Sequence, residues 1–204
     1  MTADPMPPSD GEVPDWLVPP PGGFQADDLD RMPNLPRHTE LIDGSLVLVS
    51  PQAMFHMLVI RFLEQELGGQ VPEDLAVGRE MTVTLGRRQR PKPDLLILRV
   101  DSIVDLAQTT FKPTDVVLVV EVVSPDSVER DRIRKPQLYA EAGIPHLWRV
   151  ESADGHAVVY VYELDPATGK YVLTGIHHDR LRLTVPFGID LDLTQATRLK
   201  PPRG

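Results

Sequence analysis

The chain has 204 residues, no cysteine and a formal net charge of −9 at pH 7. The length allows one domain with a substantial core, and the missing cysteine excludes disulfides and thiolate metal sites. The acidic balance argues against a general nucleic-acid binder. No apolar stretch approaches the roughly 20 residues of a membrane span, and the acidic, proline-rich start is unlike a secretory signal. We therefore expect a cytoplasmic protein with no membrane contact. The sequence does not decide the oligomeric state, and a homodimer is one possibility.

The N-terminal segment differs in composition from the rest. Residues 1–36 hold 9 of the 21 prolines and few aliphatic side chains. Proline without a period, mixed with Gly and Asp, is typical of extended chain. We predict a flexible lead-in over residues 1–36, within which residues 25–32 could dock on the core. One folded domain is expected over 37–195 and a loose tail over 196–204.

The first half of the domain predicts a hairpin, a helix and two strands. Asp43-Gly44 lies between two apolar runs, which is a strong hairpin signal over residues 40–49. Apolar residues at helical spacing predict a helix over residues 53–67, ended by two glycines. The two strands are expected over residues 77–85 and 93–100.

The second half centres on a run of Val and Leu over residues 115–123. A run without polar alternation predicts a strand buried on both faces. Pro136 fits the first turn of the next helix, because proline lacks an N–H and clashes with the carbonyl four residues back. That helix should cover residues 133–142, or kink if it starts earlier. The remaining strands are expected over residues 146–150, 157–164, 170–176 and 181–185.

Glu121 is the one carboxylate inside the buried run. A buried charge costs several kcal/mol unless an ion pair, a raised pKa or a metal compensates for it. Asp94 opens the preceding strand, so neighbouring strands would bring both acids to one point at the edge of the sheet. Two converging carboxylates favour a shared cation, and all-oxygen ligation suits Mg²⁺. Lys135, at the following helix start, could position an attacking water or stabilise developing negative charge.

The alternative interpretation of these three residues is purely structural. Asp94 would cap a turn, Glu121 would face solvent on an edge strand, and Lys135 would lie on the surface. Spacing alone does not separate this interpretation from a catalytic site.

Several longer segments add to these three residues. They are ELIDGSLVLVSP, RPKPDLLIL, VVEVVSPDSVERDR and KPQLYAEAGIPHLWRVE. In this order they resemble the Uma-type endonuclease family, of the PD-(D/E)XK, restriction-endonuclease-like superfamily. Pro93-Asp94 and Glu121 after an apolar run are similar to the PD-(D/E)XK signature of that superfamily. The resemblance implies an α/β fold with a mixed sheet, that is, a restriction-endonuclease-like αβββαβ core with added N- and C-terminal hairpins. This agrees with the order of elements predicted above.

The resemblance also implies a metal site, and the chain departs from the signature at one position. Asp94, Glu121 and the backbone carbonyl of Val122 would hold Mg²⁺ or Mn²⁺. Val123 stands where the signature has its lysine. The family's lysine looks displaced into the following helix, where Lys135 lies in the pattern RxxKxxxY.

Three accessory residues and two basic groups complete the predicted site. Glu40 could be an outer acidic partner, His56 a contact to phosphate or water, and Ser124 a contact to a metal-bound water. Each also has an ordinary structural explanation, as a strand end, a helix histidine and a turn hydroxyl. The residues expected to contact the DNA backbone are Arg87, Arg88, Arg90, Lys92 and Arg132.

Three functional hypotheses follow. The first is a metal-dependent phosphodiesterase, an endonuclease acting on DNA, with Asp94, Glu121 and Lys135 as its catalytic residues. The second is a catalytically inactive nuclease-fold module that binds nucleic acid or protein. The third is an interaction protein in which Lys135 pairs directly with both Asp94 and Glu121. The sequence favours the first.

Overall fold

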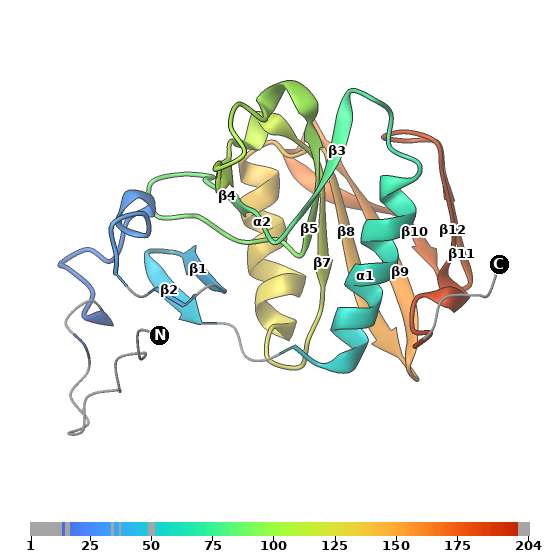
Figure 1. The fold of residues 1–204 in the computed structure, drawn as a ribbon, viewed down its shortest axis with the longest axis horizontal. Coiled ribbons are helices and arrows are strands. Elements are labelled where there is room, and N and C mark those ends of the chain that lie inside the picture. The colour runs from blue at the N-terminus through green and yellow to red at the C-terminus, as the bar shows by residue number, and fades with distance from the viewer. Residues whose placement is uncertain (1–13, 15–16, 34, 37, 49–51, 200–204) are drawn as a thin grey trace, which may run out of the picture.

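A six-stranded mixed sheet forms the centre of the computed structural model (Figure 1), which describes residues 14, 17–33, 35–36, 38–48 and 52–199. The strand order is β10-β9-β8-β7-β5-β3. The strands are β3 (Leu75–Arg79), β5 (Leu95–Arg99), β7 (Val116–Val122), β8 (His146–Ala153), β9 (His156–Asp165) and β10 (Lys170–His177). Strands β7 and β8 are parallel, and the other neighbours are antiparallel.

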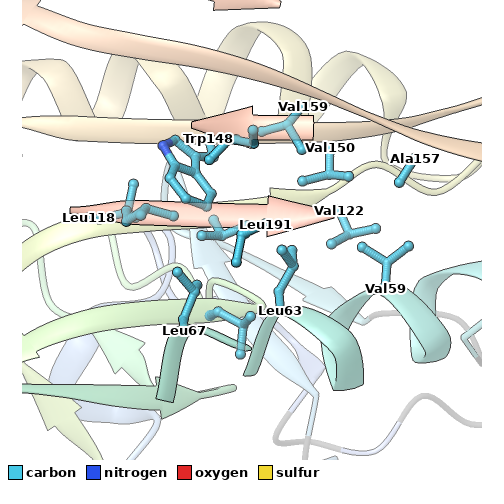
Figure 2. Packing of buried hydrophobic residues seen from close by; sticks show 14 of the residues in the cluster. Val59, Leu63, Leu67, Leu118, Val122, Trp148, Val150, Ala157, Val159 and Leu191 are labelled. Atoms are coloured by element: carbon cyan, nitrogen blue, oxygen red, sulfur yellow. The ribbon is translucent and has the colours of Figure 1, made fainter. Parts of the chain in front are cut away.

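Helices cover the two faces of this sheet. Helix α1 (Met54–Gly68) packs on one face, where Val59 and Leu63 share a core cluster with Leu118 and Trp148 (Figure 2). Helix α2 (Lys135–Glu141) packs on the other face, where Tyr139 joins a second apolar cluster. Among the helices of the described residues, none is long and apolar enough to cross a membrane.

Smaller elements surround the sheet. They are the hairpin β1 (Thr39–Ile42) and β2 (Ser45–Leu48), the parallel pair β4 (Thr82–Val83) and β6 (Thr110–Phe111), the hairpin β11 (Arg180–Leu183) and β12 (Ile189–Asp192), and the 3₁₀ turns η2 (Ala26–Asp28), η3 (Val100–Ser102), η4 (Pro113–Asp115) and η6 (Leu193–Gln195). Within the predicted lead-in, Phe24 and Ala26 are buried against Leu41 of β1.

The predicted architecture is confirmed. The elements α1, β3, β5, β7, α2 and β8 follow one another in the αβββαβ order, with hairpins added on both sides. The N-terminal hairpin turns at Asp43 and Gly44, whose φ angles of 53° and 78° suit the tight turn that an Asp-Gly pair favours. Val49, predicted as the end of this hairpin, lies outside the described residues.

The structure adds detail to the prediction at three places, and at the first of them the prediction is wrong. The strand expected over residues 77–85 is broken at Glu80, which has a φ of 51° and donates its N–H to the Asp94 carbonyl at 3.1 Å. The short strands β6 and β12 were not expected, because each is too short to show a periodicity. The second helix takes the earlier, irregular start that the sequence left open, because a π-helical turn η5 (Arg130–Arg134) leads into α2.

Candidate active site

A pocket of about 260 Å³ opens where β5 begins and β7 ends. Its lining carries six carboxylates, which are Glu40, Glu80, Asp94, Glu121, Asp126 and Asp131, and three Lys or Arg side chains, which are Lys92, Arg130 and Lys135. Because acids outnumber bases, the pocket favours bound cations or protons.

Antiparallel pairing of β5 with β7 brings Asp94 and Glu121 to this pocket. Leu95 lies opposite Val120, so the residue before β5 lies beside the last residues of β7. Asp94 Oδ2 accepts the backbone N–H of Val122 at 2.7 Å. The two acids come from distant parts of the sequence, and the register of one strand pair fixes their closeness.

Glu121 is 2% exposed and has a partner on each carboxylate oxygen. Its Oε1 accepts the hydroxyl of Tyr139 at 2.6 Å, and its Oε2 accepts Lys135 Nζ at 3.1 Å. Burial raises the pKa of Glu121 well above the ordinary value, and the neighbouring carboxylates of Asp131, Asp94 and Glu40 add to this rise. Burial thus disfavours the charged form of Glu121, and the ammonium group of Lys135 opposes this effect.

Lys135 is 4% exposed and lies among three carboxylates. Its Nζ is 2.8 Å from Glu40 Oε1, 3.1 Å from Glu121 Oε2 and 3.3 Å from Asp131 Oδ1. Burial lowers the pKa of Lys135, but the surrounding carboxylates outweigh burial and hold this pKa well above the usual range. Lys135 is thus an ammonium ion aimed at the acidic cluster.

The π-helical turn η5 gives the helix the phase that brings its side chains into the pocket. Asp131, Lys135 and Tyr139 are spaced by four residues, and all three contact Glu121 or Lys135. The Lys135 N–H bonds to the carbonyl of Arg130, five residues back. This wider turn also accommodates Pro136, which has no N–H to donate.

Two of these three helix residues were not predicted as site residues. Asp131 and Tyr139 were missed, although their i, i+4 spacing from Lys135 would have placed them on the same helix face. With Lys135 buried, that spacing identifies its nearest partners on the helix.

His56 of α1 contacts the carboxylate of Asp94. Its Nε2 is 3.1 Å from Asp94 Oδ1, and its side chain is buried near the start of α1. The other ring nitrogen, Nδ1, is buried without a hydrogen-bond partner among the described residues. His56 therefore orients Asp94 and borders the pocket.

Glu40 comes from the hairpin β1–β2 and is 1% exposed. Besides Lys135, its Oε1 accepts the backbone N–H of Lys92 at 2.9 Å. Its Oε2 is 3.5 Å from Arg130 Nε, and no hydrogen bond reaches this oxygen within the described parts of the chain. The hairpin is fastened to η5 by Arg134, whose Nε lies 2.8 Å from Asp43 Oδ2.

Ser124 lies in the turn after β7, on the wall of the pocket. Its hydroxyl is 3.0 Å from the hydroxyl of Ser127, and Ser127 also bonds the backbone N–H of Ser124. The hydroxyl of Ser124 thus takes part in a turn, which is the ordinary explanation considered for it.

The five predicted DNA-contacting residues differ in burial and in their partners. Lys92 lines the pocket, and burial lowers its pKa. Arg87 and Arg88 are exposed, and Arg88 donates to the Asp43 carbonyl. Arg90 is buried, and its guanidinium donates to Asp30, to the Ala26 carbonyl and to Thr82. Arg132 is exposed and pairs with Glu151 of β8.

The donor set fits a hard divalent cation in its chemistry. Over the described residues, no three His, Cys, Asp or Glu side chains are arranged to hold a metal ion as they stand. The groups around the pocket are nevertheless mainly carboxylate oxygens, which Mg²⁺ and Mn²⁺ prefer. One of these oxygens, Glu40 Oε2, is buried with no hydrogen-bond donor among the described residues, and its ion-pair partner Arg130 lies 3.5 Å away. Lys135 contacts three of the carboxylates at once. The pocket can therefore accept further positive charge.

Comparisons with known proteins identify the family and the fold. The model of a family described as Uma2, "Putative restriction endonuclease", matches residues 26–196. The chain is also similar to a solved structure from Anabaena variabilis ATCC 29413, titled as a putative nuclease belonging to DUF820, with a TM-score of 0.66 and 16% sequence identity. This similarity covers 85% of the present chain and 97% of the other, and it shows a shared restriction-endonuclease-like fold. Among curated proteins, none matches.

Proposed function

This chain belongs to the Uma2 family, and we propose that it is a nuclease that hydrolyses phosphodiester bonds in DNA at the pocket around Glu121. One observation carries the proposal. Two strands and one helix bring Asp94, Glu121 and Lys135, from three separate parts of the sequence, to the same pocket. A buried cluster of this charge is costly to fold, so a role in binding or catalysis explains why the chain has it.

The proposed metal ligands are Asp94, Glu121 and the backbone carbonyl of Val122. A divalent cation bound there would lower the pKa of a water molecule and neutralise charge on the phosphate. Tyr139 and His56 each hold one of the two carboxylates, at 2.6 and 3.1 Å respectively. These contacts restrict the carboxylates to the pocket and so reduce the reorganisation that ligand binding requires.

Lys135 is proposed to act on the attacking water and on the phosphate. Its ammonium group is held at the acidic cluster by three carboxylates. When substrate enters, the same group can orient the water and stabilise the negative charge that develops on phosphate oxygens. Lys92 and Arg130 line the pocket and offer positive charge to the DNA backbone.

The test is cleavage of supercoiled plasmid DNA with Mg²⁺ or Mn²⁺, using the wild type and Asp94→Asn. The matched control is Asp101→Asn, because Asp101 is an exposed acid at the opposite end of β5. We expect nicking by the wild type and by Asp101→Asn, and a loss of at least about 100-fold in Asp94→Asn. Intact plasmid over a wide range of wild-type protein would contradict the proposal.

A second candidate is a nuclease-fold module that binds without turnover. This candidate is favoured because both carboxylate oxygens of Glu121 already have a protein partner, Tyr139 on one and Lys135 on the other. Calorimetric titration with Mn²⁺ separates the candidates when it is combined with the plasmid assay. Metal binding without any cleavage supports the binding module, and metal binding with cleavage supports the nuclease.

A further inference from the structure

The outer strand β10 exposes apolar side chains at an edge of the sheet. It pairs with β9 on one side and ends the order of the six described strands on the other. Val172, Leu173 and Ile176 are 50%, 44% and 48% exposed. The opposite edge strand, β3, is shorter, and its side chains are mostly half-buried. A long edge strand with exposed apolar side chains is a template for pairing with another strand.

The register of β10 against β9 shows which side chains share a face. Tyr171 and Ile176 lie opposite Leu164 and Tyr160, on the face that α2 covers. Val172 and Gly175 lie opposite Glu163 and Val161, on the face that α1 covers. An irregularity between Leu173 and Gly175 separates these two halves of the strand.

We propose that β10 pairs with β10 of a second copy of this chain, antiparallel, about a two-fold axis between Leu173 and Thr174. In this register, Tyr171 lies opposite Ile176 of the second copy, and Val172 lies opposite Gly175. Each pair joins residues of the same face, as neighbouring strands of one sheet require. The irregularity of each strand lies on the two-fold axis, next to the irregularity of the other strand. The regular half before it in one copy therefore pairs with the regular half after it in the other.

The side chains of β10 favour a second copy over an unrelated strand. The strand is self-complementary, because one register pairs its halves face to face and covers the three exposed apolar side chains. Gly175, opposite Val172, carries no side chain of its own, and the imidazole of His177 lies beside it. The one Lys or Arg of β10, Lys170, lies at its end, where it does not interrupt the centre of the pairing. An isologous contact of this kind closes as a dimer.

The pairing leaves the two pockets independent of each other. The axis is perpendicular to the joined sheet, and the strands of the second copy run in the opposite direction. Each pocket lies where β5 begins and β7 ends, so the two pockets lie at opposite ends of the joined sheet. The dimer therefore goes beyond the proposed nuclease function and does not depend on it.

Sedimentation velocity at several concentrations tests the proposal with the full chain. We expect a dimer for the wild type and a monomer for Leu173→Lys with unchanged circular dichroism. Leu106→Lys is the matched control, because Leu106 is 100% exposed outside the six-stranded sheet, and it should stay dimeric. A monomeric wild type at all concentrations, or a dimer that persists in Leu173→Lys, overturns the proposal.

Cross-linking tests the register and decides the matter if Leu173→Lys does not fold. The chain has no cysteine, so Leu173→Cys carries one thiol, and its two copies lie on either side of the axis. Oxidation should give a disulfide-linked dimer at low protein concentration, and Leu106→Cys should not. Equal cross-linking of both variants would contradict the pairing of β10.

Discussion

The two faces of strand β7 are both buried, but they are stabilised in different ways. On the α1 face, Leu118, Val120 and Val122 belong to one apolar cluster. On the α2 face, Val119 is followed by Glu121, which meets Lys135 and Tyr139. The apolar face gains stability from the area removed from water. The acidic face gains stability only when its charges are balanced.

Within one strand, the α1 face thus serves stability alone, whereas the α2 face also carries the proposed chemistry. A change on the α1 face should alter the free energy of unfolding and leave the response to cations unchanged. A change on the α2 face should alter both. Three experiments on thermal or denaturant unfolding test this, from the largest expected effect to the smallest.

Removing the ammonium group should have the largest effect. Lys135→Met leaves Glu40, Glu121 and Asp131 without their shared cation, and breaking a buried charge pair in this way costs about 3–5 kcal/mol. We expect a lower melting temperature that recovers in part with added Mg²⁺. Lys112→Met is the control, since Lys112 is exposed, and it should change neither quantity. A Lys135→Met protein as stable as the wild type would show that the cluster is not balanced by this lysine.

Truncating a side chain on the apolar face should have a similar or somewhat smaller effect. Leu63 is 1% exposed, so Leu63→Ala should cost about 2–4 kcal/mol through lost transfer energy and the cavity it leaves. Its melting temperature should respond to Mg²⁺ as the wild type does. Met54→Ala, on the same helix but 60% exposed, should be nearly neutral. If Leu63→Ala changed the response of the melting temperature to Mg²⁺, the two faces of β7 would be energetically coupled.

The pH dependence of stability should show the smallest effect. Burial raises the pKa of Glu121 above its ordinary value of 4.5, so the unfolded chain loses this proton first as pH rises. Glu121 then contributes a fall in stability above pH 4.5, which ends once the pH passes the raised pKa. The slope is at most about 1.4 kcal/mol per pH unit for one proton.

Glu121→Gln should remove this fall, because an amide does not titrate in this range. The measurement is urea unfolding of both proteins at several pH values between 5 and 8. Glu129→Gln, at an exposed position before η5, should keep the slope of the wild type. A slope that survives in Glu121→Gln would mean that another group causes it.

Much of the fold followed from local patterns in the sequence. The apolar run over β7, the helical spacing over α1 and the Asp43-Gly44 turn each carried enough signal to predict one element. The break at Glu80 and the start of the second helix carried too little. The first depends on a hydrogen bond to Asp94, which is distant in the sequence. The second depends on a π-helical turn, which local periodicity does not predict.

The candidate site was also predictable only where a residue carries a local signal. Asp94, Glu121 and Lys135 were identified because each interrupts a pattern or follows a known signature. Arg90 looked like a surface cation among others, but its contacts with Asp30 and the Ala26 carbonyl bury it. No local pattern distinguishes it from the exposed Arg88.

The spacing of apolar residues was enough to predict the order of the main helices and strands and an acid inside an apolar strand. Glu40 and Asp131 join Glu121 around one ammonium group only in the folded chain. Those contacts link a hairpin, a helix and a strand through the register of the sheet and the phase of η5. Charge balance in a buried pocket depends on distances of a few ångströms, and such distances are set by packing rather than by local sequence.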